Sequence, residues 1–345
     1  MNGKRVTIYD IAKELSISTA TVNRALTGKN KVSEETRQKV FDAAQRMGFR
    51  PNTIARSLAR RPIRLAVVAF TSFPEFHNPL INGARETARE LMDYNVQVDY
   101  FNYDQGASNN EKGDAFLAST LHAIAMSGYD GALICAKQCP AFQELREKHV
   151  FIATAVNDVE RENRRFGIRY NAKVAGRIAA ELLWRMGDGV RPVAVATGSL
   201  KKPSIHFDIQ EGFDQQLKTT PLTLAEVYRH HDDPDEAYET TKDMLNRHPD
   251  LGGIYVDSFN SLGVVRAVTE RGLGGRICIV TSDIYRELRG FISQGLVCAS
   301  IFQNQFEQGR QGLRLLYHAI ADATDVPDQV VLPPQIILGS NLELY

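Results

Sequence analysis

The sequence predicts an α/β protein with an all-α module at its amino end, followed by two doubly wound parallel-sheet subdomains. Apolar residues in the amino-terminal segment recur only at helical spacing. From Arg64 onward, short apolar runs typical of buried parallel strands, the first at 64–70 and the last at 329–338, alternate with amphipathic helical segments. Repeated strand–helix units imply parallel sheets with right-handed crossovers, and about ten predicted strands suit two sheets better than one.

The charge of the chain is uneven along its length. Residues 1–61 hold 13 Lys/Arg and 5 Asp/Glu, a net charge of +8, whereas the remainder carries −8 and the whole chain carries zero. This asymmetry indicates a module that binds a polyanion, joined to a body with a different task. The alternative is an ordinary solvated basic surface.

The composition also indicates the cellular compartment of the protein and whether its cysteines bind a metal. No apolar segment of a secretory signal follows the basic start, and no run approaches the roughly 18 apolar residues of a membrane span. Cys135 and Cys139 lack the second cysteine pair or nearby histidines of a zinc site, and Cys278 and Cys298 fall in apolar runs. We therefore expect a cytoplasmic protein with four reduced, structural cysteines, no metal and no cofactor.

Four short helices are predicted in the amino-terminal module, and local signals mark the first three. Residues 7–15 carry one apolar stripe, and a break at Ser16–Ser18 precedes a second helix over 19–26, which Ser18 can cap. Ser33 is placed to cap a third helix, and Gly48 is placed to end it. Two helices joined by a three-residue turn, with a third packed across them, form a helix-turn-helix.

The second of these helices has an outer face of short side chains. Val22, Ala25 and Leu26 are expected to point inward. The residues left outside are Thr19, Ala20, Asn23 and Arg24. The second helix of a helix-turn-helix enters the major groove with its amino-terminal residues against base edges. Small side chains let it lie deep, hydroxyls reach bases or phosphates, and an arginine can donate two hydrogen bonds to a guanine.

Residues 51–62 form a basic segment of about three turns that is marginal as an isolated helix. One interpretation is a plain linker. The other is a hinge helix that folds on DNA, pairs with a second copy, and wedges Leu58 between base steps in the minor groove.

Three segments resemble the headpiece and hinge of the LacI-type family of transcriptional regulators, the family of the lactose and galactose repressors. They are VTIYDIAKELSISTATVNRALTG, VSEETRQKVFDAAQRMGFRPN and ARSLARR. The resemblance implies that Thr19 and Ala20 are base readers, that Arg24 contacts a base or phosphate, and that Leu58 intercalates. Asn23 stands where relatives usually carry serine, which leaves the operator sequence open. The candidate DNA contacts are Thr7, Ser18, Thr19, Ala20, Thr21, Asn23, Arg24, Asn52, Arg56 and Leu58.

The rest of the chain agrees in layout with the regulatory core of that family, which resembles periplasmic sugar-binding proteins. The resemblance implies two subdomains that are discontinuous in sequence, with the chain crossing between them near 156–170, 283–286 and 303–306. The expected domains are a DNA-binding headpiece at 1–50, the hinge at 51–62, and an effector-binding and dimerisation core at 63–345.

Polar and aromatic residues follow several predicted strands, which is where open α/β sheets bind ligands. Carboxylates and amides with aromatic walls suit a polyhydroxylated neutral ligand. The candidate effector contacts are Phe73, Phe76, Asn157, Asp158, Asn171, His206, Asp257, Asp283 and Gln303. Each of them could instead be a loop residue that caps a helix, but the resemblance implies ligand contacts at Asp283 and Gln303.

The sequence departs from the family pattern in the predicted cleft. Ile209 stands where relatives commonly carry an arginine that forks onto ligand hydroxyls, and Asp257 and Ser258 replace the common Asn-Asp pair. A sugar or sugar derivative is the first choice of effector. The alternatives are a nucleoside, a sugar acid, a phosphorylated sugar or a protein partner.

Enzyme motifs are not found: no G-x-S-x-G, P-loop or G-x-G-x-x-G follows a strand. A solute-binding receptor would share the body but has no use for a basic headpiece. We therefore expect a ligand-responsive DNA-binding regulator, most simply a repressor, that binds a palindromic operator as a homodimer. The tail after the last apolar run is too short for two heptads, so no coiled-coil tetramer is expected.

Overall fold

The computed structural model describes residues 6–26, 32–49, 60–70, 74–103, 111–135, 138–198 and 204–345. The chain divides into two compact units: Met1–Pro62 with Asp93–Asn95, here called the headpiece, and the remainder, here called the core. The predicted hinge lies almost wholly outside the described residues. Four candidate contacts also lie outside them: Asn52, Arg56, Leu58 and Phe73.

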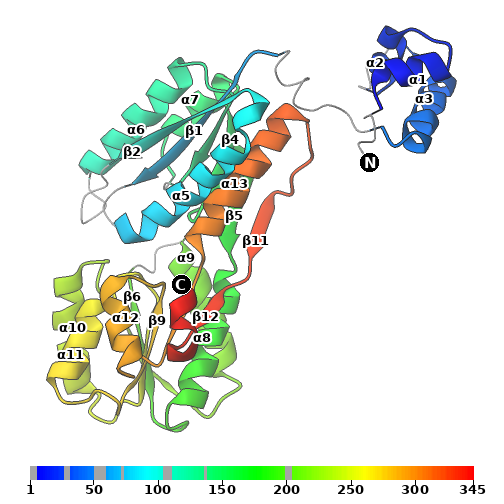
Figure 1. Ribbon diagram of the computed structural model, residues 1–345. Helices are drawn as coiled ribbons and strands as arrows, with labels where there is room; N and C mark the ends of the chain where they lie inside the picture. Colours follow the sequence, from blue (N-terminus) through cyan, green and yellow to red (C-terminus); the bar gives the residue numbers. More distant parts are fainter. Residues whose placement is uncertain are drawn as a thin grey trace. The chain divides into compact units, whose positions relative to one another are not determined.

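The headpiece contains the three predicted helices, α1 (Ile8–Glu14), α2 (Thr19–Leu26) and α3 (Glu34–Arg46) (Figure 1). The hydroxyl of Ser33 accepts a hydrogen bond from the backbone N–H of Thr36 at 3.3 Å, which caps the start of α3 as expected. Just beyond the end of α3, Gly48 has a φ of +67°, a conformation that glycine adopts without strain.

Within the described residues, the core contains two six-stranded sheets (Figure 1). The first has the order β11 (Gln329–Leu332), β5 (Phe166–Tyr170), β4 (Phe151–Ala155), β3 (Gly131–Ile134), β1 (Ile63–Phe70), β2 (Val96–Tyr103). The second has the order β12 (Gln335–Ile337), β10 (Ala299–Phe302), β9 (Cys278–Ser282), β8 (Gly253–Val256), β6 (Val193–Thr197), β7 (Leu224–Arg229). All described pairs are parallel except β10–β12. Each sheet with its helices is called a lobe below.

Helices cover both faces of each sheet, as in doubly wound folds (Figure 1). In the first lobe α5 (Pro74–Glu90) packs along α13 (Gln305–Ala321), and α6 (Glu111–Met126) packs along α7 (Ala141–Glu147). In the second lobe the helices are α8 (Ala172–Met186), α9 (Ile205–Leu217), α10 (Pro234–Arg247), α11 (Leu262–Glu270) and α12 (Arg286–Ser293). Short 3₁₀ helices span Met92–Tyr94, Arg161–Asn163 and Gly339–Leu344.

Strand β6 shows why both faces need cover. Val193 and Val195 pack into the cluster under α8 and α9, whereas Ala194 and Ala196 pack into the cluster under α10, α11 and α12. Alternate residues of a strand point to opposite faces, so a run that is apolar throughout predicts a sheet buried on both sides.

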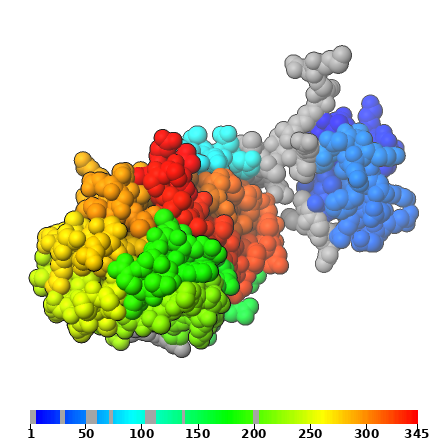
Figure 2. Space-filling view, turned by 90° about the horizontal axis from the view of Figure 1, so that it is seen from below, coloured from blue at the N-terminus to red at the C-terminus, as the bar shows by residue number. Residues whose placement is uncertain are grey.

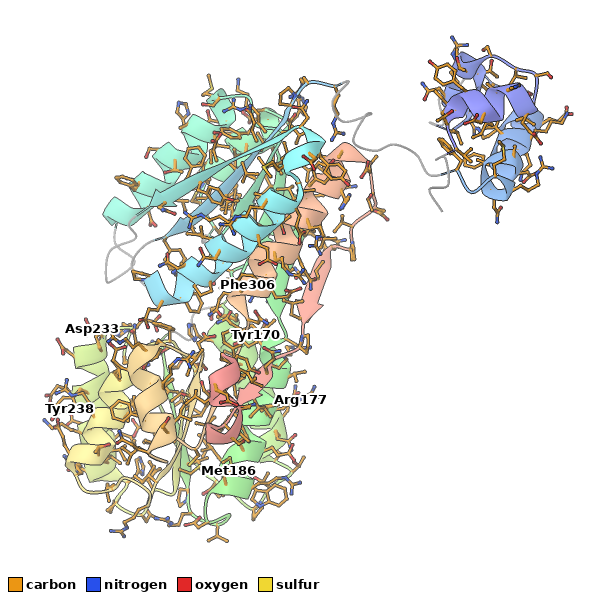
Figure 3. The ribbon with its side chains drawn as sticks, viewed as in Figure 1. Tyr170, Arg177, Met186, Asp233, Tyr238 and Phe306 are labelled. Carbon is orange, nitrogen blue, oxygen red and sulfur yellow. The ribbon has the colours of Figure 1, made fainter. Side chains whose placement is uncertain are left out.

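Two helix pairs come close because glycine faces the partner backbone. A Cβ at Gly176 of α8 would lie 1.9 Å from the carbonyl oxygen of Ile209 in α9. A Cβ at Gly83 of α5 would lie 1.9 Å from the carbonyl oxygen of Phe306 in α13. These contacts hold the amino-terminal turns of α9 and α13 in place, and those turns border the region where the lobes meet (Figure 3).

The path between the lobes differs from the predicted one. Strand β5, which was not predicted, occupies 166–170, and the chain passes to the second lobe only after Tyr170. The predicted crossing at 283–286 is wrong, because β9, α12 and β10 all belong to the second lobe. The chain returns between Phe302 and Gln305.

The last predicted strand, over 329–338, is two strands in different sheets. Pro333 and Pro334 separate β11 from β12, because proline has no N–H for a strand ladder. Strand β12 runs antiparallel to β10, against the prediction of parallel sheets throughout. In Figure 2 the carboxyl-terminal segment (red) lies beside the orange segment that includes α12, and the 3₁₀ helix at 339–344 contacts α12.

Candidate functional site

The helices of the headpiece pack around one small hydrophobic cluster. Ser16, in the turn between α1 and α2, has a φ of +54°, and the N–H of Ile17 donates to the carbonyl of Ala12 at 3.0 Å. The buried residues of this headpiece cluster are Ile11, Ala12, Val22, Ala25, Val40, Ala43 and Ala44. Because α2 contributes only Val22 and Ala25 to this buried set, most of its remaining surface faces outward.

The predicted contacts Ser18 and Thr21 shape the amino end of α2. The hydroxyl oxygen of Ser18 accepts a hydrogen bond from the backbone N–H of Thr21 at 3.0 Å, and the two hydroxyl oxygens lie 2.8 Å apart. The start of α1 is capped differently: the Asp10 carboxylate accepts hydrogen bonds from the N–H and the hydroxyl of Thr7, at 2.8 and 2.7 Å. The Ser18 hydroxyl therefore caps α2 and orients its start, whereas the Thr7 side chain makes no capping hydrogen bond.

The outer face of α2 carries the other predicted contacts. Ala20, Asn23 and Arg24 are exposed, and Thr19 and Thr21 are half-buried. On the opposite side Val22 is fully buried. A helix with a small, polar outer face and one arginine has the shape and the donors needed to enter a major groove.

In the core, the carboxyl ends of β6 and β8 bring His206 and Asp257 together. The carboxylate Oδ1 of Asp257 accepts hydrogen bonds from His206 Nδ1 at 2.9 Å and from the backbone N–H of Gly198 at 3.4 Å. Burial lowers the pKa of His206, but the charge and the hydrogen bond of Asp257 outweigh it and raise that pKa to about 9. His206 is therefore protonated at neutral pH.

Two atoms beside this pair are buried without a hydrogen-bond partner in the described part of the chain. One is Oδ2 of Asp257, and the other is Nδ1 of His230. His230 is fully buried, its Nε2 lies 3.3 Å from the hydroxyl of Ser258, and burial lowers its pKa. Buried polar atoms are nearly always hydrogen-bonded in native proteins, to protein groups or to water, so these two mark a place that a water molecule or a ligand can fill.

The second group of polar residues lies at the carboxyl ends of β9 and β10. Gln303 Nε2 donates to Oδ2 of Asp283 at 2.8 Å, and Gln305 Nε2 donates to Oδ1 at 3.0 Å. Burial raises the pKa of Asp283 to about 6, although these donors favour its charged form. The side-chain oxygens of both glutamines are buried and lack a hydrogen-bond partner among the described residues. Gln305 was not predicted from the sequence.

A chain of hydrogen bonds continues from Gln303 into the first lobe. Gln308 Nε2 donates to the backbone oxygen of Gln303 at 2.9 Å, and the N–H of Val156 donates to Gln308 Oε1 at 3.0 Å. Val156 has a φ of +67°, which is strained for a β-branched residue. The surroundings of Asp283 are thus connected to the end of β4 through the crossing segment.

Two buried tyrosines interact electrostatically with both polar groups. Burial and then the charges of Tyr255, Asp283 and Asp257 raise the pKa of Tyr170 well above its usual value. Burial and Asp257 also raise the pKa of Tyr255, whose ring stacks on Phe213 with centroids 5.9 Å apart. Figure 3 labels Tyr170 near the meeting of the lobes.

The lobes also touch through side chains of α5. The ring of Phe76 packs edge-on against Phe259 of the second lobe, with centroids 5.4 Å apart, and Phe259 packs against Tyr285 at 4.7 Å. The predicted aromatic wall of the cleft is therefore in contact with the opposite lobe.

Not every predicted effector contact joins this site. Both carboxylate oxygens of Asp158 are occupied by Arg164, with Thr154 and Gln329 as further donors. Burial raises the pKa of Asp158, but the hydrogen bonds and charge of Arg164 outweigh it and lower that pKa. Asp158 is thus part of a structural ion pair, and the structure does not bring it to Asp257 or Asp283.

Asn171 and Asn157 lie near the passage between the lobes in other roles. The side-chain oxygen of Asn171 accepts a hydrogen bond from the N–H of Val174 at 3.1 Å and so caps α8. Asn157 is half-buried just after β4, where its N–H donates to the carbonyl of Ala155 at 2.8 Å. Residue type and position after a strand do not distinguish these helix and turn roles from ligand contacts.

Metal-binding clusters are absent from the described residues: no three or more His, Cys, Asp and Glu side chains are arranged to hold an ion. None of the helices that the structure describes has the length and apolar character that a membrane crossing requires.

Comparison with known proteins gives the class that this architecture defines. Residues 65–324 match the model of the periplasmic binding protein domain, and residues 7–52 match the model of bacterial regulatory proteins of the lacI family. A solved glucose-galactose binding protein from Geobacillus stearothermophilus shares the core fold, with a TM-score of 0.72 and 20% identity over 82% of this chain and 99% of that one. A solute-binding protein from Burkholderia graminis, solved in complex with D-arabinose, has a TM-score of 0.73 and 17% sequence identity. The match covers 83% of this chain and 98% of that chain.

Similar curated proteins extend over nearly the full chain. The catabolite control protein A of Priestia megaterium is 26% identical over 343 residues, which cover 96% of this chain and 97% of the relative. The transcriptional repressor PurR of Histophilus somni is 23% identical over 349 residues, which cover 98% of this chain and 99% of the relative. The chain belongs to the lacI family of bacterial regulatory proteins, as its headpiece sequence indicated.

Proposed function

We propose that this protein is a transcriptional regulator, most simply a repressor, that binds a palindromic operator as a homodimer and responds to a small molecule held between its two lobes. The observation that carries the proposal is one chain with two units: a headpiece whose α2 presents a small, polar, arginine-bearing face, and a core with buried acceptors that have no hydrogen-bond partner among the described residues. It acts by binding and not by catalysis, in the cytoplasm, where the DNA is.

The DNA part of the proposal rests on α2 and on charge. One recognition helix covers only a half-site, so two copies related by a two-fold axis read a near-palindrome. The +8 charge of residues 1–61 supports strong attraction to phosphates, which weakens as salt is added.

Selection of binding sequences from random duplex DNA with the full-length protein tests this part. We expect two inverted half-sites protected together in footprinting, and two chains per DNA duplex in analytical ultracentrifugation. Protection of one asymmetric half-site by a single chain would contradict the dimer and the palindrome.

The ligand part rests on the hydrogen-bonding atoms left open in the core. Asp257 Oδ2, Gln303 Oε1 and Gln305 Oε1 are acceptors, so they suit a ligand that supplies several donors, such as the hydroxyls of a sugar. Ile209 is buried in the hydrophobic cluster under α8 and α9. This position therefore offers no arginine side chain to bind an anionic group of a ligand. A neutral sugar is therefore favoured over a sugar acid or a phosphorylated sugar.

A thermal-shift screen of the full-length protein tests the ligand class with matched compounds: D-arabinose, D-glucose, D-gluconate, glucose 6-phosphate and inosine. A ligand that binds only the native state stabilises it by about 2.7 kcal/mol at a concentration of 100 times Kd. We expect stabilisation by a neutral sugar that Asp257→Asn abolishes. Stabilisation by the phosphate or the acid alone would contradict the favoured class while leaving the regulator itself in place.

A further inference from the structure

Cys278 and Cys298 lie side by side at the amino ends of two neighbouring strands. Cys278 is the first residue of β9, and Cys298 immediately precedes β10. These strands are parallel, with Ala299 opposite Val280, and the N–H of Cys298 donates to the carbonyl of Ile279 at 2.8 Å. One residue of offset between strands 4.8 Å apart places the two Cα atoms about 6 Å from each other. That separation falls within the range that a disulfide spans.

The side chains of both cysteines lie on the same side of the second sheet. Cys278 belongs to the hydrophobic cluster under α8 and α9, and Cys298 packs against that cluster from the segment before the regular strand. The two sulfurs are near enough to shift each other's pKa. The sequence predicted four structural cysteines, but this pairing across strands separates these two from an ordinary buried thiol.

The two sulfurs differ in access and in acidity. Cys278 is 6% exposed, whereas Cys298 is half-buried. The neighbouring Cys278 thiol lowers the pKa of Cys298, and the Cys298 sulfur together with burial raises the pKa of Cys278. Because the thiolate is the reactive form, Cys298 is the sulfur that meets an oxidant first, and Cys278 is the one placed to resolve it.

Cys135 in the first lobe provides a contrast within the same chain. It is fully buried, and burial raises the pKa of its thiol to about 12. A thiol of this kind stays protonated at neutral pH, so it does not react first with an oxidant.

We propose that Cys278 and Cys298 form a redox-modified pair that hydrogen peroxide converts to a disulfide. The Cys298 thiolate attacks one peroxide oxygen, the O–O bond breaks, and Cys298 sulfenic acid and hydroxide form. The Cys278 sulfur then attacks the sulfenic sulfur, and the hydroxyl leaves as water with the Cys278 proton. The hydroxide takes up the proton that Cys298 released when it ionised. In total, two thiols lose two electrons and two protons, and the peroxide is reduced to two waters.

A disulfide between these cysteines would restrain residues of the proposed ligand site. The strands that start at this cysteine pair end at the hydrogen-bonded pair Asp283 and Gln303. A disulfide ties the amino ends of the two strands and so restrains the pair at their carboxyl ends. The proposal for the cysteines does not depend on the proposed regulatory function, because it concerns chemistry within the second lobe alone.

Peptide mapping of the full-length protein tests the pair directly. Reduced protein is titrated with hydrogen peroxide, unfolded in N-ethylmaleimide, and digested with trypsin without reduction. Cleavage after arginine puts the two cysteines on separate peptides, 277–286 and 290–310. We expect these peptides to appear joined, with a mass about 2 Da below their sum because two hydrogens are lost. Dithiothreitol should separate them.

Variants decide between a specific pair and general oxidation. Cys298→Ser should abolish the joined peptide, and Cys135→Ser should leave it unchanged. Oxidised wild type should also melt at a higher temperature than reduced wild type, and Cys298→Ser should show no such rise. The proposal fails if Cys278 and Cys298 are alkylated to the same extent as Cys135 at every peroxide dose, or if Cys298 is converted only to the sulfinic acid.

Discussion

The carboxylate of Glu75, in the first lobe, accepts a hydrogen bond from the backbone N–H of Arg286, in the first turn of α12 in the second lobe, at 3.0 Å. The residue before that helix, Tyr285, makes no capping hydrogen bond with its side chain. Glu75 of the first lobe therefore places a carboxylate at the amino end of α12 in the second lobe, where an anion is favourable. Together with the contact between Phe76 and Phe259, this hydrogen bond links the two lobes directly.

Removing this link should open the core. Glu75→Ala takes away a helix cap, which typically contributes about 0.5–2 kcal/mol, and we expect the equilibrium between closed and open lobes to shift toward open. Small-angle X-ray scattering of the full-length variant should give a larger radius of gyration than wild type. Glu86→Gln, an exposed change on the same helix, is the control and should leave the radius unchanged. Equal radii for Glu75→Ala and wild type would mean that the link does not hold the lobes.

The pair of His206 and Asp257 should make stability depend on pH. The pKa of His206 is raised from 6.5 to about 9 in the folded protein, so its contribution is fully present below pH 6.5 and is lost as pH rises through 9. The contribution is on the order of 3 kcal/mol. Urea unfolding across this pH range should show the loss in wild type and a flatter profile in Asp257→Asn. Parallel profiles for the two proteins would contradict the pairing.

Asp158 should behave as a structural residue. Its partner Arg164 has a side chain only 3% exposed, and Asp158→Asn leaves that buried charge with Asp328 as its remaining carboxylate partner. We expect a loss of about 3 kcal/mol in the free energy of unfolding. The pKa of His206, followed by NMR, should stay as in wild type, whereas Asp257→Asn should lower it. A stable Asp158→Asn protein would show that the ion pair is dispensable.

Arg24 should determine base preference and not merely affinity. Arg24→Ala should weaken binding to the selected operator by roughly 1–3 kcal/mol and relax the preference at one base position, because a lost bidentate contact removes discrimination. Fluorescence anisotropy against operators with single base changes measures both effects. Lys39→Ala, which removes an exposed charge on α3, is the matched control and should weaken all sequences alike. An unchanged base preference in Arg24→Ala would place Arg24 on phosphate.

The sequence by itself determined the helices of the headpiece and most of the strands of the core. Ser18 and Ser33 mark helix starts because a hydroxyl beside the first free N–H groups caps a helix by local geometry alone. Apolar runs such as 64–70 and 193–197 predict buried parallel strands, because both faces of such a strand need apolar residues. These signals lie within a few residues of the feature that they predict.

Only the tertiary structure decided which polar residues share a site. Asp158 and Asp257 both follow a predicted strand. Arg164 and Gln329 bind the carboxylate of Asp158. One carboxylate oxygen of Asp257 binds His206, whereas the other has no hydrogen-bond partner among the residues that the structure describes. Those partners lie 6, 171 and 51 residues away in the chain, and no local pattern shows which of them meet. The division of 329–338 between two sheets has the same cause, because the pairing of β11 with β5 and of β12 with β10 depends on strands distant in sequence.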